Sequence, residues 1–204
     1  MQSLLVPSVS LPVGKRRAIS IGKRFRVKAM RAVVQRVASA SVEVDGRIVS
    51  EIGPGLLVLV GIHHSDSDSD ADYICRKVLN MRLFQNENNG KTWDHSVIQK
   101  NYQVLLVSQF TLYGFLKGNK PDFHVAMPPQ QAKTFYASLV DRFRNAYNPD
   151  AIKDGVFGAM MKVNLQFPNS FVWVPLLLQY LNNAYVKNPH TVMTGRNTVD
   201  AAES

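Results

Sequence analysis

Three hydrogen-bonding side chains lie close together at the end of an apolar run in the segment VLLVSQFTLYG, residues 104–114. Ser108, Gln109 and Thr111 follow four hydrophobic residues that are typical of a buried strand. If a strand over 102–113 continues through them, its alternation places Ser108 on one face and Gln109 and Thr111 on the other. Polar groups at the end of a buried strand either bond to neighbouring backbone or line a pocket. Both interpretations stay open on this pattern alone.

A hydroxyl nucleophile needs a base within hydrogen-bond reach, and that base must itself be held by a third group. No histidine lies in a motif that suggests such a base; the histidines are His63, His64, His95, His124 and His190. The spacing therefore does not support Ser108 or Thr111 as an activated nucleophile.

The alternating acids Asp66, Asp68 and Asp70 suggest a calcium-binding loop at first sight. The sixth position of that loop is Ala71 instead of glycine, and the twelfth is Lys77 instead of glutamate. The acids are better explained as the start of a helix, whose predicted apolar face is Ala71, Ile74, Val78 and Leu79. We therefore expect no metal site and no cofactor.

The remaining patterns predict the elements that position these residues. Strands are expected over 31–37, 39–45, 47–53, 56–62 and 155–165, and Asp45-Gly46 is a strong hairpin signal. A second helix is expected to start near Pro128-Pro129, with an apolar face of Ala132, Phe135, Tyr136, Leu139, Val140, Phe143 and Tyr147. This order predicts a single compact α/β domain with a mixed, largely antiparallel sheet and two helices that cover one face.

Basic residues are concentrated in the first 29 positions. The net charge is +9, but residues 1–29 hold seven basic residues and no acid, which leaves 17 basic against 15 acidic residues in the rest. Such an acid-poor, Arg- and Ser-bearing leader is typical of an organellar transit peptide. The alternatives are a disordered basic arm that binds RNA, or a start site that is seldom used. No apolar run reaches the length of a membrane span, and the single Cys75 fits a reducing compartment.

Several long segments together resemble the D-aminoacyl-tRNA deacylase (D-tyrosyl-tRNA deacylase) family. They occur in the family's order over about residues 30–165, and are MRAVVQRVASASVEVDGRIVSEIGPGLLVLVGI from Met30, VSQFTLYG, KGNKPDF, PP before a helix, and GVFGAMMKV. The resemblance implies a compact, barrel-like fold, a homodimer, and hydrolysis of the ester that joins a D-amino acid, or glycine, to the 3′-terminal adenosine of tRNA. It implies no cofactor.

The same resemblance implies which residues form the site. The catalytic floor is expected to be Ser108, Gln109, Phe110 and Thr111, where main-chain N–H groups near Phe110 and Thr111 polarise the ester and the substrate's ribose 2′-hydroxyl helps to activate water. An older proposal for the family makes the motif threonine, here Thr111, the nucleophile. Substrate binding is expected from Arg36 at the site mouth and from Phe157, Gly158, Ala159 and Met160. The expected partner is the acceptor end of tRNA, with Lys100, Lys117 and Lys120 as candidate contacts.

The resemblance ends where the tail begins, so we divide the chain into a leader (1–29), a deacylase domain (30–165) and a divergent tail (166–204). The family continues with a Gly-Pro pair that reaches into the partner's pocket and rejects L-amino acids, but no Gly-Pro follows Leu165 here. Two hypotheses follow: relaxed chirality with editing of L-residues, or an inactive module that binds the tRNA end. The expected location is the chloroplast or mitochondrion if the leader acts as a transit peptide, and the cytoplasm if translation starts at Met30.

Overall fold

The computed structural model describes residues 30–168, 176–181, 184–185 and 199–200. The leader and most of the tail beyond residue 168 lie outside the described residues, together with the expectations attached to them. Helices within the described ranges fall short of the length and apolar character needed to cross a membrane.

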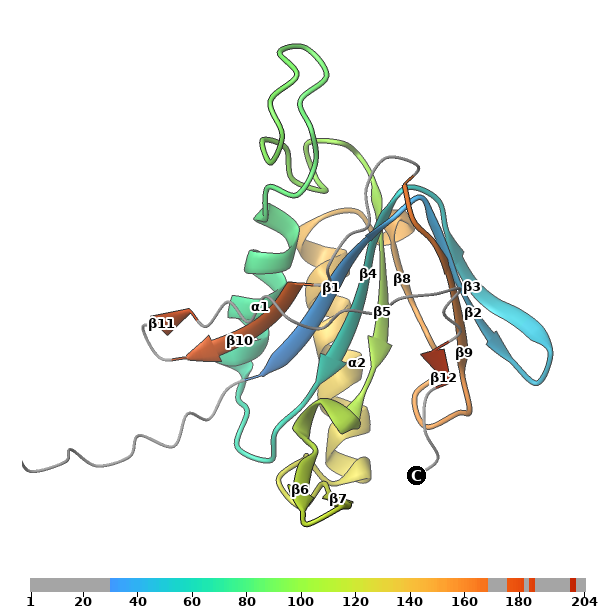
Figure 1. Cartoon of the computed structure of the whole chain (residues 1–204), viewed down its shortest axis with the longest axis vertical. Coiled ribbons are helices and arrows are strands. Elements are labelled where there is room, and N and C mark those ends of the chain that lie inside the picture. The colour runs from blue at the N-terminus through green and yellow to red at the C-terminus, as the bar shows by residue number, and fades with distance from the viewer. Residues whose placement is uncertain (1–29, 169–175, 182–183, 186–198, 201–204) are drawn as a thin grey trace, which may run out of the picture.

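The larger sheet contains six strands in the order β11-β10-β1-β4-β5-β8. Their bounds are β1 (Arg31–Val37), β4 (Gly55–Gly61), β5 (Gln103–Ser108), β8 (Ile152–Asp154), β10 (Leu176–Leu181) and β11 (Ala184–Tyr185). β1 runs antiparallel to β4, whereas β4, β5 and β8 are mutually parallel. β4 and β5 therefore end at the same edge of the sheet (Figure 1).

The smaller sheet is antiparallel, with the order β12-β9-β2-β3. Its strands are β2 (Ser39–Val44), β3 (Arg47–Ile52), β9 (Lys162–Gln166) and β12 (Val199–Asp200). The hairpin predicted at Asp45-Gly46 is confirmed, and both turn residues have positive φ, 49° and 75°. Such a turn matches the twist of the strands that it joins.

Two helices, α1 (Asp68–Asn80) and α2 (Pro129–Ala146), cover one face of the larger sheet. Leu56, Val58 and Val60 of β4 pack with the helices, whereas Leu57 packs with the smaller sheet. β5 alternates in the same way, so both strands are buried on both faces and read as continuous apolar runs. The expected α/β domain with a mixed sheet and two covering helices is confirmed, although the sheets do not close into a barrel within the described residues.

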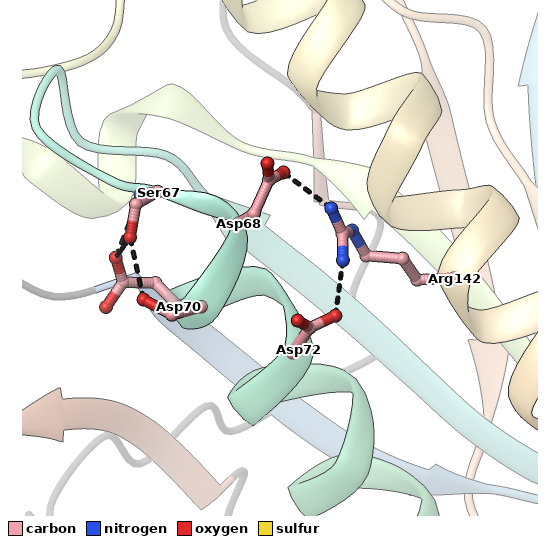
Figure 2. A network of polar contacts seen from close by, with 6 residues as sticks. Ser67, Asp68, Asp70, Asp72 and Arg142 are labelled. Atoms are coloured by element: carbon pink, nitrogen blue, oxygen red, sulfur yellow. Dashed lines mark hydrogen bonds and ion pairs between the residues drawn. The ribbon is translucent and has the colours of Figure 1, made fainter.

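An arginine on α2 joins the two helices (Figure 2). Arg142 donates to Asp68 at 2.5 Å through one guanidinium nitrogen and to Asp72 through another. At the start of α1, the Asp70 carboxylate accepts from the Ser67 backbone N–H at 2.8 Å and from the Ser67 hydroxyl at 2.6 Å. Of the acids that suggested a calcium loop, Asp70 therefore caps α1 and Asp68 helps to hold α1 against α2.

Two predicted strands are wrong in extent. β5 ends at Ser108, and residues Phe110–Tyr113 form the 3₁₀ helix η1. The Gln109 N–H makes the last bond to β4, to the Val60 carbonyl at 2.7 Å. β4 itself ends one residue later, at Gly61, and the chain turns into η1. The strand expected over 155–165 begins only at Lys162. Gly158 in the preceding loop has a φ of +78°, which is incompatible with a strand.

Three short elements complete the described fold and had no clear sequence signal. A hairpin of β6 (Phe115–Lys117) and β7 (Lys120–Asp122) follows η1, and the 3₁₀ helix η2 (Pro149–Ala151) precedes β8. In Figure 1 the hairpin lies beyond the ends of β4 and β5, on the opposite side of the molecule from the long loop between α1 and β5.

Candidate active site

A cavity of about 650 Å³ opens where β4 and β5 end. Its walls come from the loop after β7, the first turn of α2 and the loop between β8 and β9. The residues that line it are Val60, Ile62, Ser108, Gln109, Phe110, Phe123, His124, Ala126, Met127, Pro128, Pro129, Ala132, Phe157, Gly158, Ala159, Met160 and Met161. Most are apolar, and the polar side chains are those of Ser108, Gln109 and His124, which is the usual composition of a small-ligand site.

The expected catalytic floor is largely gathered at this cavity. Ser108, Gln109 and Phe110 line it, and the Phe110 ring packs edge-on against Phe123 at 5.1 Å between centroids. Thr111 is not among the lining residues. Its hydroxyl accepts a hydrogen bond from the Gln109 side-chain amide. An amide cannot serve as a base, so this contact does not activate Thr111 as a nucleophile.

The turn into η1 leaves two backbone donors without an acceptor inside the helix. Its first bond runs from the Leu112 N–H to the Gln109 carbonyl at 3.3 Å. The N–H groups of Phe110 and Thr111 precede that bond, and the first N–H groups of any helix have no intrahelical partner. The first of these two donors belongs to Phe110, which lines the cavity, and the second belongs to the next residue in the chain.

The expected substrate-binding loop forms the opposite wall. Phe157, Gly158, Ala159 and Met160 all line the cavity, and Met160 remains 55% exposed. Phe157 is supported from behind by the Tyr136 ring at 5.7 Å. The apolar side chains on this wall suit an aromatic base.

The expected position of Arg36 at the site mouth needs correction. Arg36 pairs with Leu56 near the start of β4, whereas the cavity lies at the end of β4. Its Nη1 donates to the Leu83 carbonyl at 3.0 Å, and burial lowers the pKa of Arg36. β1 is antiparallel to β4, so Arg31 at the start of β1 lies at the site end of the sheet. Arg36, near the end of β1, lies at the opposite end of the sheet.

Arg31 is the arginine that lies at the site end, and the sequence reading missed it. Its Nη1 donates to the Leu112 carbonyl in η1 at 2.6 Å, and its guanidinium lies 4.6 Å from the centre of the Tyr113 ring. Gly61 contributes to the same packing, since a Cβ at that position would lie 2.9 Å from the Leu112 Cβ. η1 is therefore held against the ends of β1 and β4.

The loop after β7 was also missed, and it supplies a histidine. Asp122 Oδ1 accepts from the backbone N–H of His124 at 3.0 Å and lies 2.9 Å from its ring Nδ1. The other carboxylate oxygen, Oδ2, lies 2.9 Å from Lys117 Nζ. The hydrogen bond from Lys117 and those from His124 hold the pKa of Asp122 well below its usual range. The only sequence signal was the Asp-x-His spacing.

This arrangement combines a mostly apolar cavity with the backbone donors at the start of η1. It can hold an aromatic base against Phe157 and Gly158 while a carbonyl oxygen meets the N–H groups at the start of η1. Such fixed donors stabilise the oxyanion that forms when water attacks an ester. The geometry fits acyl transfer to water without a nucleophilic side chain.

Comparison with known proteins assigns the family. A sequence model of the D-Tyr-tRNA(Tyr) deacylase family matches residues 33–168. The chain is 52% identical over 136 residues to a D-aminoacyl-tRNA deacylase of Dictyostelium discoideum, covering 67% of this chain and 90% of that protein. It is 53% identical over 137 residues to the human D-aminoacyl-tRNA deacylase 1, covering 67% of this chain and 65% of that protein.

A solved structure titled c-Myc DNA Unwinding Element Binding Protein has a TM-score of 0.68 and 47% identity, over 76% of this chain and 99% of that one. The match to the family model spans most of the described domain and includes every residue that lines the cavity. The chain belongs to the D-Tyr-tRNA(Tyr) deacylase family.

Proposed function

We propose that this protein hydrolyses the ester bond of D-aminoacyl-tRNA, and of glycine mischarged onto tRNA, to release the free amino acid and tRNA in translation quality control. The observation that carries the proposal is the cavity between Ser108–Phe110 and the 157–160 loop. The donors on one side and the apolar wall on the other match an aminoacyl ester attached to a terminal adenosine. The relatives named D-aminoacyl-tRNA deacylase support the same reading.

In the proposed reaction the chain's own groups mainly position and polarise the ester. The N–H groups of Phe110 and Thr111 receive the carbonyl oxygen, and each such donor is worth about 10²–10³ in rate. Water, activated with help from the ribose 2′-hydroxyl, attacks the carbonyl carbon. The C–O bond to the 3′-oxygen then breaks, and that oxygen takes up a proton. Gln109 holds Thr111 through its amide and so fixes the start of η1.

The proposed macromolecular partner is the acceptor end of tRNA, bound by a homodimer. The deacylase domain and tail together carry 17 basic and 15 acidic residues, so their net charge is only +2. That charge balance favours a grip on the single-stranded end over long contacts with the stem. Light scattering tests the dimer, because a monomer at micromolar concentration would contradict it.

The deciding experiment measures release of amino acid from D-Tyr-tRNA, Gly-tRNA and L-Tyr-tRNA by the full chain. We expect hydrolysis of the D-Tyr and Gly esters. Thr111→Val tests the two mechanisms, since a backbone oxyanion site retains activity within about tenfold. Loss of more than about a thousandfold, with an intact fold, would instead support a Thr111 nucleophile. No release from any of the three substrates would refute the proposed function.

A second candidate activity rests on the tail. No Gly-Pro pair follows Leu165, and the family match stops at residue 168. We propose as the alternative that this chain lacks the family's chirality filter and either edits L-residues or binds the tRNA end without hydrolysis. Equal rates on D- and L-Tyr-tRNA support relaxed editing, and binding without release supports the inactive module. Strict D preference by this chain excludes both.

The leader supports a proposed location in the chloroplast or mitochondrion. Residues 1–29 contain seven basic residues and no acid, which is the composition of a transit peptide. A fluorescent fusion of residues 1–29 should enter an organelle, and a fusion that begins at Met30 should remain in the cytoplasm. Cytoplasmic signal from both fusions would contradict the transit peptide.

A further inference from the structure

His124 is the one titratable side chain among the described residues that line the cavity. Its side chain is 59% exposed, so it lies at the rim and not at the floor. The mechanism proposed above gives it no task, because the ester is polarised by backbone groups near Phe110. An imidazole fixed by Asp122 at the entrance of a mostly apolar cavity therefore needs a separate explanation.

The imidazole is oriented by a carboxylate that has further partners. Asp122 Oδ1 lies 2.9 Å from Nδ1, and the same oxygen accepts from the backbone N–H of His124. Nε2 is therefore the ring nitrogen available to a ligand. Asp122 Oδ2 lies 2.9 Å from Lys117 Nζ, which leaves the carboxylate between the imidazole and the ammonium group.

The hairpin beside His124 adds exposed positive charge. Lys117 and Lys120 face each other in the register of β6 and β7, and both are exposed. Residues 115–124 hold these two lysines and His124 against a single acid, Asp122. A rim of this sign is complementary to a phosphodiester. The deacylase domain and tail together are nearly neutral, with 17 basic and 15 acidic residues.

We propose that His124, held by Asp122 and flanked by Lys117 and Lys120, binds the phosphodiester on the 5′ side of the terminal nucleoside of the substrate. This inference rests on the proposed function, because the ester at Phe110 and the base at Phe157 place the terminal nucleoside inside the cavity. The next group along the strand is that phosphodiester, and it must leave over the rim. Imidazolium Nε2–H donates to a phosphate oxygen while Nδ1–H donates to Asp122.

The experiment is a double-mutant cycle between protein and RNA. The probe is an uncharged acceptor-stem minihelix with its single-stranded 3′ end, labelled for fluorescence anisotropy. A second probe carries a methylphosphonate at the last phosphodiester, which removes its charge. Wild-type protein should bind the neutral probe about 5- to 20-fold more weakly. His124→Gln should lose a similar factor on the native probe and little more on the methylphosphonate probe.

Asp122→Asn separates orientation from net charge. The change makes the hairpin more positive, so simple electrostatic attraction predicts tighter binding. We expect weaker binding, because His124 Nδ1 loses its carboxylate. His64→Gln controls for loss of an exposed imidazole outside the cavity lining, and Arg47→Gln controls for loss of an exposed charge on β3. Both controls should leave the Kd unchanged.

The outcomes separate this inference from the proposed function. Additive losses in the cycle, no effect of His124→Gln, or no measurable binding of the native probe would overturn it. A third probe lacks the 2′-hydroxyl of its terminal ribose. If His124→Gln is coupled to that change and not to the methylphosphonate, the inference is overturned and the imidazole is assigned to the ribose. If the phosphate coupling is found but no aminoacyl ester is hydrolysed, the binding site stands and the hydrolase proposal fails. If D-Tyr-tRNA is hydrolysed but no coupling appears, the reverse holds.

Discussion

The guanidinium of Arg31, the first residue of β1, donates a 2.6 Å hydrogen bond to the carbonyl of Leu112 in η1. The same group lies over the Tyr113 ring, 4.6 Å from its centroid. These contacts join the start of the chain's first described strand to the turn that carries the proposed oxyanion donors. Residues 81 positions apart in the sequence therefore fix one piece of backbone.

Replacing Arg31 should impair catalysis more than substrate binding. Arg31→Met removes the bond to Leu112 and the charge over Tyr113, so η1 loses a restraint while the cavity walls remain. A small displacement of positioned groups costs up to about 10²-fold in rate. We expect kcat on D-Tyr-tRNA to fall about tenfold with KM within about twofold, and Arg31→Lys to recover part of the loss.

The matched control for Arg31 is Arg47→Met, on the exposed strand β3. It should leave kcat and KM unchanged. A rise in KM with constant kcat for Arg31→Met would contradict a positioning task and indicate a direct substrate contact.

Gly61 should tolerate no side chain. A Cβ there would lie 2.9 Å from the Leu112 Cβ and 3.2 Å from two Tyr113 ring carbons, so Gly61→Ala must push η1 away from β4. We expect a loss of about 1–3 kcal/mol in the free energy of unfolding, measured by urea titration, and a larger fall in kcat than for Arg31→Met. Gly158→Ala is the comparison, because its Cβ meets nothing within 4 Å and only its φ of +78° is unfavourable. Equal stability of Gly61→Ala and wild type would refute this packing argument.

Much of the scaffold could be predicted because it rests on local periodicity. The faces of α1 and α2, the Asp45-Gly46 hairpin and the apolar run of β4 each carry their pattern within a few residues. Among the residues that line the cavity, those named in advance are Ser108 to Phe110 and 157–160, and they were named from the family resemblance. Arg31 and His124 were missed and Arg36 was misplaced, since strand direction and the path of the loop after β7 are properties of the assembled fold. The helix η1 was missed because its residues continue the apolar character of β5.

A half-buried carboxylate, Asp66 in the loop before α1, should make stability depend on pH. Asp66 Oδ2 accepts from the His63 N–H at 2.6 Å, and Oδ1 is buried without a partner among the described residues. Burial raises the pKa of Asp66 to about 7. The folded state thus holds a proton that the unfolded chain releases near pH 4. Stability from this group is complete below about pH 4 and is lost as the pH rises through about 7.

Asp66→Asn tests that dependence. The amide keeps an acceptor for the His63 N–H but has no charge to bury, so the variant should be more stable than wild type at pH 8. We expect the difference in unfolding free energy to grow by on the order of 2 kcal/mol between pH 5 and pH 8. Histidine titration is common to both proteins and cancels in this difference. Asp150→Asn, on the exposed turn before β8, is the control and should show no such trend. A pH-independent difference for Asp66→Asn would contradict the raised pKa.

The clamp between α1 and α2 should contribute modestly and be sensitive to salt. Arg142 reaches both Asp68 and Asp72, whose side chains are 78% and 63% exposed. Exposed ion pairs contribute about 0–1 kcal/mol each, although the forked guanidinium geometry favours the upper end of that range. Arg142→Lys keeps the charge but not the fork, so we expect a loss of about 0.5–1 kcal/mol in urea titrations at low salt. That loss should shrink at 0.5 M NaCl, about where the Debye length falls below 5 Å.

The control for Arg142→Lys is Lys133→Arg, on the exposed face of α2. Arg144→Lys is less suitable because Arg144 bonds Asp154. A loss that stays constant in high salt would show that Arg142 acts through packing of its aliphatic stem and not through the two carboxylates.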